Sequence, residues 1–301
     1  MSLFASYDPP PYRPPSEANS LLLRVTRGCP WNQCTFCSMY KGLKFEKRPV
    51  EEVLRDIDTL RQFSGTAAPT VFIGDSNSLV LETKPLVEIL QHLYKAFPSV
   101  ERVTSYARAR TLSKKPMDEL KAIRQAGLTR LHIGLETGDP ELLEEIKKGS
   151  TPEQMAEGAN RAKEAGFEVS LYVLAGIGGE KKWKQHAEGT AKVLNQISPH
   201  FIRIRTYVPT PFSTLWDKVQ GGSFELASAE TILMEQRRLI ELLQVTSEYL
   251  SDHISNYVPV YGELPKDQAA MLQTIDRALA ILRKDDGYRR SLESKRHLTS
   301  L

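Results

Sequence analysis

The sequence has few cysteines, no long apolar run and little net charge, and each shortage excludes a class of protein. Its 301 residues include only three cysteines, an odd and small number that does not suit a disulfide framework. No apolar run approaches the roughly twenty residues of a transmembrane helix, so we expect no membrane partner. A net charge of +3 is too small to indicate a nucleic-acid partner by itself.

Internal repeats are also absent, and a proline-rich stretch at residues 9–15 is the one segment of biased composition. Residues 1–17 carry prolines where a secretory signal would have an apolar core. We therefore expect a cytoplasmic protein, in a reducing compartment that keeps thiolates available. The length suits an α/β barrel with an appendage.

All three cysteines lie in one short loop. Cys29, Cys34 and Cys37 have the spacing C-x4-C-x2-C and directly follow a β-prone run at residues 21–26. Three thiolates this close together predict a pocket for one metal centre. A structural zinc site would need a fourth protein ligand, and the chain has neither a second C-x2-C nor an H-x3-5-H pair. An iron–sulfur cluster accepts three cysteines if a non-protein ligand takes the fourth iron, so the spacing favours a cluster and leaves zinc open.

The rest of the chain alternates between β-prone and helical segments. Six strands separated by helices indicate parallel strands with right-handed crossovers. Polar residues alternate with apolar ones in several strands, whereas a doubly wound sheet would bury both faces. This favours an α/β fold of the partial (β/α)6 barrel type, with polar faces lining a lumen. The expected strands are 21–26, 70–73, 102–107, 130–136, 169–175 and 201–208, and the expected helices are 50–63, 84–97, 116–126, 139–148, 151–165, 183–197, 228–250 and 267–283.

The pattern divides the chain into three parts. We expect an extended proline-rich arm at residues 1–19, a β/α core at 20–215 and a helical C-terminal extension at 216–301. The extension would begin with a long amphipathic helix and end in a basic, polar tail from Lys284.

Unusual residues stand where the expected strands end. Ligands in parallel β/α folds bind at the C-terminal ends of strands. In addition to the cysteine loop, these strand ends carry Gly74-Asp75-Ser76-Asn77, Glu136-Thr137-Gly138 and the glycine-rich stretch 176–180. One glycine-rich turn alone is usually only a tight turn. All of them on one rim, next to the cysteine loop, predict a cofactor site.

These motifs resemble the radical S-adenosylmethionine (SAM) superfamily, and most closely its branch of oxygen-independent coproporphyrinogen oxidases and methylthiotransferases. The resemblance covers about residues 20–215, and the first cysteine gap is one residue longer than the common C-x3-C-x2-C. It implies a [4Fe-4S] cluster on Cys29, Cys34 and Cys37, with SAM on the fourth iron. It also implies reductive SAM cleavage to a radical that abstracts hydrogen from substrate, and a one-electron donor of the flavodoxin or ferredoxin type.

The resemblance assigns roles to residues of the first half of the chain. Phe36 stands where the family has an aromatic residue that packs near the adenine. Gly74, Asp75 and Ser76 stand where the family's glycine-rich turn meets the methionine amino group, although relatives often have a Gly-Glu pair there.

Four later residues match as well. Glu136 corresponds to a polar residue that contacts SAM. Lys148 stands where relatives carry a cation for the SAM carboxylate, although a charge that complements a helix end explains it equally well. Gly176 and Gly178 belong to the turn that approaches the adenine and ribose.

The polar side chains of the expected lumen indicate a small anionic substrate. By strand alternation Arg203 and Arg205 point inward, and inward arginines are costly unless paired. A substrate carboxylate or phosphate would pair them, and a lumen carboxylate such as Glu136 is the alternative. His253, in the polar loop 251–257, is a candidate proton donor or acceptor, with a purely structural loop as the alternative. The candidate catalytic residues are Arg203, Arg205, Tyr172, His132 and His253.

Several reactions stay open at this point. The chain has no cysteine left for an auxiliary cluster, which argues against sulfur insertion. Lyase, isomerase and oxidative decarboxylase chemistry all remain. A tRNA- or nucleotide-modifying enzyme is an alternative, since the basic segment 284–297 would suit a phosphate, and a metal-binding regulatory protein without catalysis is another.

Overall fold

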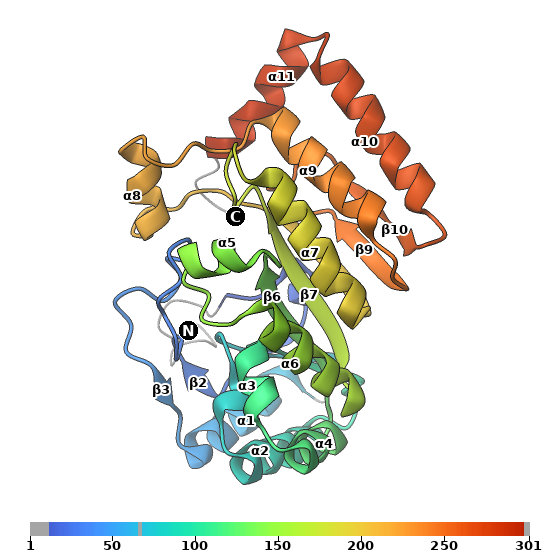
Figure 1. The fold of residues 1–301 in the computed structure, drawn as a ribbon. Coiled ribbons are helices and arrows are strands. Elements are labelled where there is room, and N and C mark those ends of the chain that lie inside the picture. Colours follow the sequence, from blue (N-terminus) through green and yellow to red (C-terminus); the bar gives the residue numbers. More distant parts are fainter. Residues whose placement is uncertain (1–11, 66–67, 298–301) are drawn as a thin grey trace. The chain divides into compact units, whose positions relative to one another are not determined.

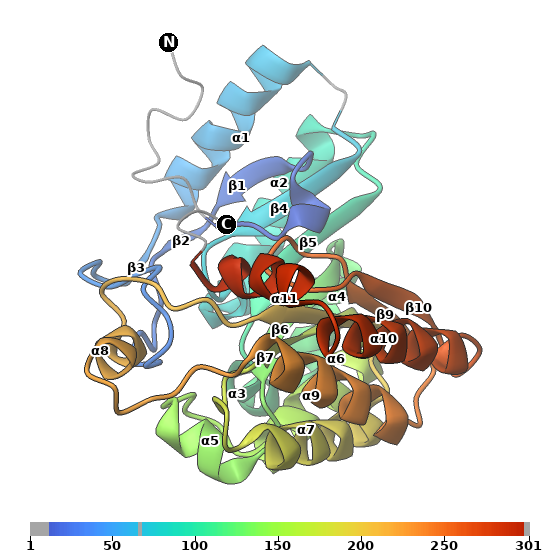
Figure 2. The ribbon, with the colours of Figure 1, turned by 90° about the horizontal axis from the view of Figure 1, so that it is seen from above.

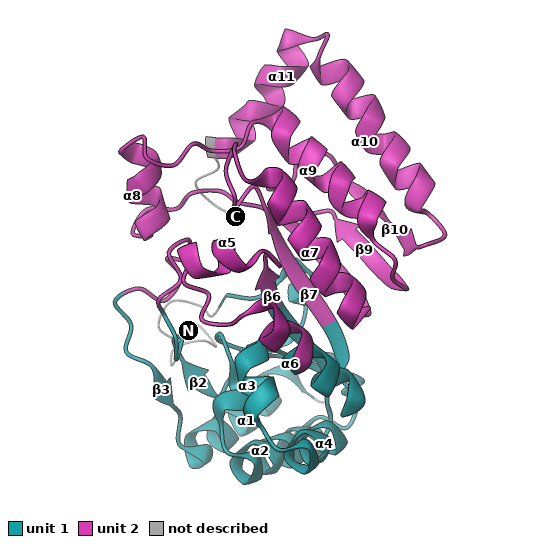
Figure 3. Cartoon of the chain, in the orientation of Figure 1, with its two compact units in different colours: residues 1–32, 42–133, 158–169 teal, residues 33–41, 134–157, 170–301 magenta. Residues whose placement is uncertain are grey.

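The computed structural model describes residues 12–65 and 68–297 and divides the chain into two compact units (Figure 3). Residues 1–11 of the expected N-terminal arm lie outside the described residues. The remainder of the arm includes the short 3-10 helix η1 (Pro15–Glu17). Unit 1 comprises residues 1–32, 42–133 and 158–169, and unit 2 comprises residues 33–41, 134–157 and 170–301.

Unit 1 is built on parallel strands. They are β1 (Leu21–Arg24), β4 (Thr70–Gly74), β5 (Arg102–Ala107) and β6 (Leu128–Glu136), with a separate pair β2 (Thr26–Arg27) and β3 (Glu46–Lys47). β1 pairs with β4, β4 with β5 and β5 with β6, all in parallel. Leu23, Ile73 and Val103 are fully buried in these strands, as expected where helices cover a parallel sheet.

The helices of unit 1 show why the sequence pattern predicted their positions. They are α1 (Val50–Ser64), α2 (Thr83–Ala96), α3 (Ala109–Lys114) and α4 (Met117–Gln125), with a 3-10 turn η2 (Ser78–Val80). In α1 two glutamates in the first turn complement the helix dipole. Its apolar residues recur at helical spacing, so Val53, Ile57 and Leu60 are all buried.

Unit 2 combines parallel strands with a helical layer. Its strands are β7 (Glu168–Ala175), β8 (Phe201–Thr206), β9 (Ser247–Ser251) and β10 (Val260–Leu264). β7, β8 and β9 are parallel, and β10 is antiparallel to β9. The helices are α5 (Pro140–Glu145), α7 (Trp183–Ile197), α8 (Thr214–Gln220), α9 (Ala229–Leu242), α10 (Gln268–Leu282) and α11 (Asp286–Glu293), followed by η3 (Ser294–His297). Helix α6 (Pro152–Glu164) begins in unit 2, and its residues from Gly158 onward belong to unit 1. Helices α7, α9 and α10 pack side by side (Figures 1 and 2).

The order of the strands is simple within each unit. It is β1-β4-β5-β6 in unit 1 and β7-β8-β9-β10 in unit 2, so neighbouring strands other than β1 and β4 are also consecutive in the chain. β6 runs from unit 1 into unit 2, and β7 begins in unit 1. Helices connect these neighbours, as the predicted β/α alternation requires.

The expected helix at residues 228–250 is wrong in its second half. α9 ends at Leu242, and β9 begins at Ser247. The side chain of Asn195, on α7, donates to the Leu242 carbonyl at 2.9 Å and accepts from the Gln244 amide at 2.8 Å. A residue far away in sequence thus ends the helix, which local periodicity could not reveal.

Several short elements were not expected from the sequence: α3, α8, β10 and α11. The basic tail predicted from Lys284 is mostly α11, which the Asp285 side chain caps by accepting from the Tyr288 amide. Ser213 caps α8 in the same way. Single caps give short helices a start without a long apolar stripe, so their pattern is weak.

Candidate functional site

The start of the cysteine loop is held by the turn after β4. Gly28, which has a left-handed φ of 82°, directs its amide to Asp75 Oδ1 at 3.4 Å. Ser76 Oγ donates to the Gly28 carbonyl at 3.1 Å. Cys29 follows at once, is partly exposed, and its sulfur accepts from the Asn32 amide at 3.3 Å. The turn therefore fixes the backbone that presents Cys29.

Asp75 itself is fully engaged within the chain. Its carboxylate is 0% exposed and accepts from Arg24 Nε at 2.6 Å and Arg24 Nη2 at 3.1 Å. This bidentate, charge-assisted pair joins the end of β1 to the end of β4. The backbone of Asp75 has a φ of 64°, a left-handed conformation that is uncommon outside glycine. The predicted contact of Gly74, Asp75 and Ser76 with SAM stays a prediction, and the structure adds an anchoring role.

Cys34 and Cys37 belong to unit 2, on a turn in which the Cys37 amide donates to the Cys34 carbonyl at 3.4 Å. Between them, the Thr35 amide donates to the Ile146 carbonyl at 3.0 Å, and the Leu215 amide donates to the Thr35 carbonyl at 2.8 Å. Neither cysteine forms a disulfide, and both residues are partly exposed. The turn is thus tied to two neighbouring segments.

Phe36 packs on a small apolar cluster of unit 2. The cluster is formed by Ile146, Ile177, Tyr207 and Leu215. Ile177 belongs to the glycine-rich turn after β7, so Phe36 and that turn share one apolar support. The structure therefore brings the predicted adenine neighbour Phe36 together with the Gly176–Gly178 turn.

Glu136 and Lys148 form an ion pair at the end of β6. Lys148 Nζ donates to Glu136 Oε1 at 2.7 Å, and the two side chains are 13% and 14% exposed. The same ammonium lies 6.0 Å from the centre of the Phe36 ring. A Cβ on Gly134 would overlap Glu136 Oε1 and Lys148 Nζ, so the ends of both side chains would have to move. Phe36, Glu136 and Lys148 are therefore gathered, as their predicted shared role requires.

A buried pair that the sequence did not indicate supports the glycine-rich turn. The Gly176 amide donates to Glu235 Oε1, on α9, at 2.9 Å. The same oxygen lies 3.0 Å from His186 Nδ1, and His186 Nε2 lies 3.2 Å from the Glu136 carbonyl. Burial lowers the pKa of His186, but the charge and hydrogen bond of Glu235, the Glu136 carbonyl and the Asp139 charge together raise it overall. The imidazolium can then donate at both nitrogens.

Neither Glu235 nor His186 belongs to a recognisable motif. Both lie on amphipathic helices, at positions where a polar residue interrupts the buried face. That interruption is the one signal in the sequence, because a buried charge needs a partner. It does not say which partner.

Three of the predicted catalytic residues gather in unit 2. The Arg205 guanidinium lies 5.1 Å from the centre of the Tyr172 ring, and its charge acts on His253. Arg203 Nε donates to Ser170 Oγ at 3.2 Å, and its guanidinium lies 5.7 Å from the Phe201 ring. Among the described residues neither arginine has an Asp or Glu partner. The alternative that Glu136 pairs with them is wrong, because Glu136 pairs with Lys148.

The loop that carries His253 is fastened to the end of β8. Asn256 Nδ2 donates to the Ile204 carbonyl at 2.8 Å, and the Thr206 amide donates to Ser255 Oγ at 3.2 Å. Burial, followed by the nearby Arg205 charge, lowers the pKa of His253 to about 4. His253 is therefore neutral near pH 7, held beside Arg205 by a well-bonded loop.

His132 is not part of that group and lies in unit 1. Its Nε2 is 3.2 Å from Glu17 Oε1, and both side chains are fully buried. Burial raises the pKa of Glu17, but hydrogen bonds from His132 and Ser20 lower it to about 2. The Tyr106 ring packs 6.0 Å from the imidazole. This environment gives His132 a structural partner, and its predicted catalytic role stays a prediction.

The donor set of the cysteine loop suits an iron–sulfur cluster. Its three ligands are thiols, the soft donors that such clusters use, and the chain has no fourth cysteine that would fill every iron. Within residues 12–65 and 68–297 no three His, Cys, Asp or Glu side chains converge as a preformed metal site. The assignment of the ligands therefore rests on the donor chemistry and on the family.

The family is decided by the comparison with known proteins. Residues 23–188, more than half of the chain, match the radical SAM superfamily. The chain belongs to the radical SAM superfamily. It is therefore an enzyme of the radical SAM class, and its cofactors are a [4Fe-4S] cluster and S-adenosylmethionine, as predicted.

Two curated relatives of this radical SAM enzyme are similar over most of its length. An uncharacterized methyltransferase of Pyrococcus horikoshii is 25% identical over 240 residues, which cover 76% of this chain and 48% of that protein. The heme chaperone HemW of Bacillus subtilis is 24% identical over 234 residues, which cover 74% of this chain and 60% of HemW. The chain spans about half the length of these relatives.

A solved structure supports the fold. Methylornithine synthase superposes with a TM-score of 0.52 at 18% identity, covering 75% of this chain and 63% of that one. The predicted α/β fold, a partial barrel with a largely helical C-terminal part, is confirmed. Within the described residues no helix is long and apolar enough to span a membrane.

Proposed function

We propose that this radical SAM enzyme abstracts hydrogen from a small anionic substrate bound at Arg203 and Arg205. The supporting observation is the absence of an Asp or Glu partner for either guanidinium among the described residues. Both side chains are held by neutral groups, Ser170 and aromatic rings, which leave the charge uncompensated. A substrate carboxylate or phosphate would supply the missing charge.

Each residue then has a defined task. Cys29, Cys34 and Cys37 would hold the cluster, which with bound SAM supplies reductive C–S cleavage and a hydrogen-abstracting radical. Arg203 and Arg205 would orient the substrate anion. The neutral His253 would accept a proton beside it.

The predicted cofactor contacts keep their assignments as part of this proposal. In unit 2 we assign Lys148 to the SAM carboxylate, Glu136 to its amino group or ribose, Phe36 to the adenine, and Gly176 and Gly178 to close backbone approach. In unit 1 we assign the backbone of Gly74 and Asp75 and the Ser76 hydroxyl to the methionine end, with Asp75 retained by Arg24.

The test is a deuterium-transfer assay with the anaerobically reconstituted enzyme. Deuterated small molecules that bear a carboxylate or phosphate are offered, and deuterium is measured in 5′-deoxyadenosine. For a molecule that transfers deuterium, Arg203→Ala and Arg205→Ala should each raise KM by about tenfold or more, since one charged hydrogen bond contributes roughly 1.5–3 kcal/mol. SAM affinity should not change.

Arg290→Ala on the exposed face of α11 is the matched control and should keep the KM of the unchanged enzyme. If both site variants also keep that KM, the substrate does not bind at these arginines. If reduced enzyme forms no 5′-deoxyadenosine at all, the proposed reaction itself is wrong.

A nucleic-acid substrate has less support. The basic C-terminal segment, which would suit a phosphate backbone, is partly occupied: Lys295 Nζ donates to the Asn256 carbonyl at 2.7 Å, and Arg296 donates to the Ala227 carbonyl. We also propose that the enzyme is cytoplasmic and that it receives its electron from a flavodoxin- or ferredoxin-type donor.

A further inference from the structure

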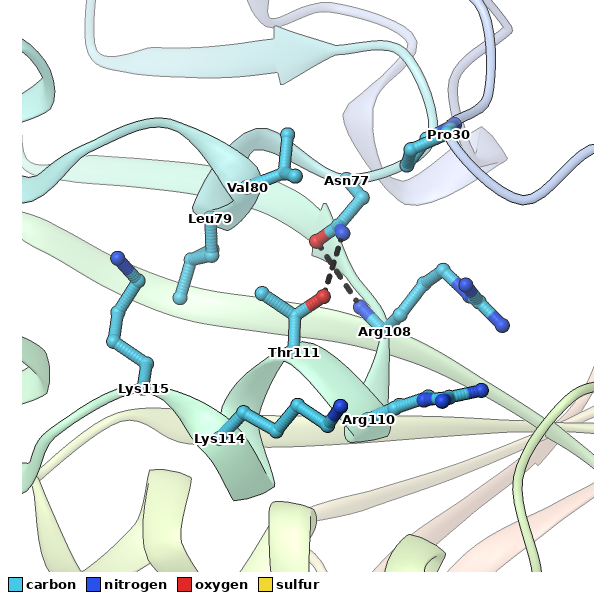
Figure 4. Close-up of a pocket in the computed structure, with 9 residues that line it drawn as sticks. All are labelled: Pro30, Asn77, Leu79, Val80, Arg108, Arg110, Thr111, Lys114 and Lys115. Carbon is cyan, nitrogen blue, oxygen red and sulfur yellow. Dashed lines mark hydrogen bonds between the residues drawn. The ribbon is translucent and has the colours of Figure 1, made fainter.

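A basic cavity in unit 1 has no role in the site described above. Its volume is about 380 Å³, and it lies between η2, α3 and the cysteine loop (Figure 4). Four of its nine lining residues are cations and none is an acid. The four are Arg108, Arg110, Lys114 and Lys115.

This imbalance of charge is specific to the cavity. A second cavity of unit 1, of about 340 Å³, also carries cations, but two glutamates line it. There Arg27 lies 3.9 Å from Glu46, and Arg48 lies 3.6 Å from Glu52. The lining of the second cavity therefore mixes four cations with two acids, whereas the lining of the first carries charges of one sign only.

The cavity wall is fixed by hydrogen bonds. Asn77 Nδ2 donates to Thr111 Oγ1 at 2.8 Å, and the Arg108 amide donates to Asn77 Oδ1 at 3.3 Å, as the dashed lines in Figure 4 show. Lys115 Nζ donates to the Leu81 carbonyl at 3.1 Å and to Glu119 Oε2, which lies outside the lining, at 3.4 Å. Lys114, by contrast, is exposed. A fixed wall with an exposed charge suits a partner that arrives from solution.

The cavity also touches the cysteine loop. Pro30, which directly follows Cys29, is one of its lining residues. The Arg108 guanidinium lies 5.1 Å from the centre of the Trp31 ring, so a cation of the cavity packs on the same loop. A partner bound here would lie against the loop that carries a predicted cluster ligand.

We propose that this basic cavity is the docking surface for an acidic one-electron carrier protein of the flavodoxin type. The proposal rests on the proposed function, because only an enzyme with a reducible cluster needs such a carrier. The carrier loses one electron and the cluster gains it, which requires approach to the cysteine loop. Complementary charge accelerates this encounter and selects an acidic partner.

The experiment compares two reductants on the reconstituted enzyme. One is dithionite, which needs no docking surface, and the other is a flavodoxin kept reduced by its NADPH-dependent reductase. The variant Arg110→Glu/Lys114→Glu should lose about tenfold or more of the flavodoxin-driven rate of 5′-deoxyadenosine formation at low flavodoxin concentration. Its dithionite-driven rate should stay within about twofold.

A matched variant tests whether position rather than net charge matters. Lys95→Glu/Lys121→Glu changes the net charge of the chain equally, on exposed residues of α2 and α4 in the same unit. It should keep the flavodoxin-driven rate. Flavodoxin binding to the full chain, measured by calorimetry, should weaken in the first variant only and should weaken with salt in the unchanged enzyme.

The outcomes separate the two proposals. If dithionite yields no 5′-deoxyadenosine from the unchanged enzyme, the proposed function fails. If dithionite works but both variants bind flavodoxin and accept electrons alike, the docking surface is overturned. Inhibition by inorganic phosphate with both reductants, absent in the Arg110→Glu/Lys114→Glu variant, would also overturn it and identify a small-anion site instead.

Discussion

Asp75 and Glu136 are two carboxylates with the same backbone φ and different surroundings. Each stands at the C-terminal end of a parallel strand, each has a φ of 64°, and each is paired with a cation at 2.6 to 2.7 Å. The pair of Asp75 with Arg24 is almost fully buried, whereas Lys148 and Glu136 are 13% and 14% exposed. Similar positions thus carry one buried ion pair that joins two strands and one partly exposed ion pair.

The difference teaches how a ligand can use an ion pair. Exchanging a buried partner leaves a charge without water or counter-ion, so Asp75 and Arg24 cannot open without a large loss of stability. A partly exposed pair can exchange one contact for another at small cost. We therefore expect stability to depend on the first pair and SAM affinity on the second.

The largest effect is expected from breaking the buried pair. Asp75→Ala strands Arg24 and should lower the free energy of unfolding by about 3–5 kcal/mol. Glu136→Ala should lower it by only about 1–2 kcal/mol. Urea unfolding of both variants measures the contrast, and equal losses would remove the distinction between the two pairs.

The next effect concerns Glu235, the buried residue that accepts from the Gly176 amide and pairs with His186. Glu235→Gln weakens two contacts of a charged acceptor and should cost roughly 1.5–3 kcal/mol, with weaker SAM binding as the turn at Gly176 loosens. Because the folded pKa of His186 is raised, the pair stabilises the fold below the unfolded pKa of about 6.5, and this contribution is lost as pH rises through the folded value.

Urea unfolding at a series of pH values from 6 upward should show this loss in the unchanged chain and not in Glu235→Gln. Glu241→Gln, on the exposed end of the same helix, is the control. Identical pH profiles for all three proteins would refute the buried charged pair.

A smaller effect on stability, with a larger one on binding, is expected at Gly134. A methyl group there overlaps Glu136 Oε1 and Lys148 Nζ, which are the flexible ends of long side chains. Gly134→Ala should therefore change the free energy of unfolding by less than about 1 kcal/mol and lower SAM affinity several-fold. Equilibrium binding of SAM measures this, with Gly287→Ala on α11 as the control. Unchanged SAM affinity would show that the Glu136–Lys148 pair takes no part in SAM binding.

The last effect is confined to acidic pH and comes from His253. Its folded pKa of about 4 lies below the unfolded value of about 6.5, so the unfolded chain binds more protons between these values. Stability should therefore be full above about pH 6.5 and fall as pH drops toward 4. His253→Asn should flatten this part of the profile in chemical unfolding measured from pH 4 to 7. A variant that keeps the slope would assign it to other groups.

The parts of the fold that the sequence predicted are those with local causes. Val53, Ile57 and Leu60 recur at helical spacing, and α1 follows them to within a residue. The glycine-rich turns also lie at strand ends as expected, since parallel strands direct their C-terminal ends to one rim.

The missed parts have causes far away in sequence. Asn195 ends α9 from another helix, so the pattern of residues 228–250 alone indicates a longer helix than exists. Arg24 and Asp75 are 51 residues apart, and nothing near Asp75 says that its charge is already paired. The same holds for Glu235, whose partner His186 lies on a different helix.

Helix α9 has one more consequence, for the modular use of this enzyme class. The superfamily match ends at residue 188, yet Glu235 on α9 holds the Gly176 amide within it. A catalytic core transplanted without α9 would lose that acceptor. Exchanging the C-terminal extension between relatives would therefore change the hydrogen bonding of the core. A chimaeric protein should keep Glu235 together with the Gly176 turn that it supports.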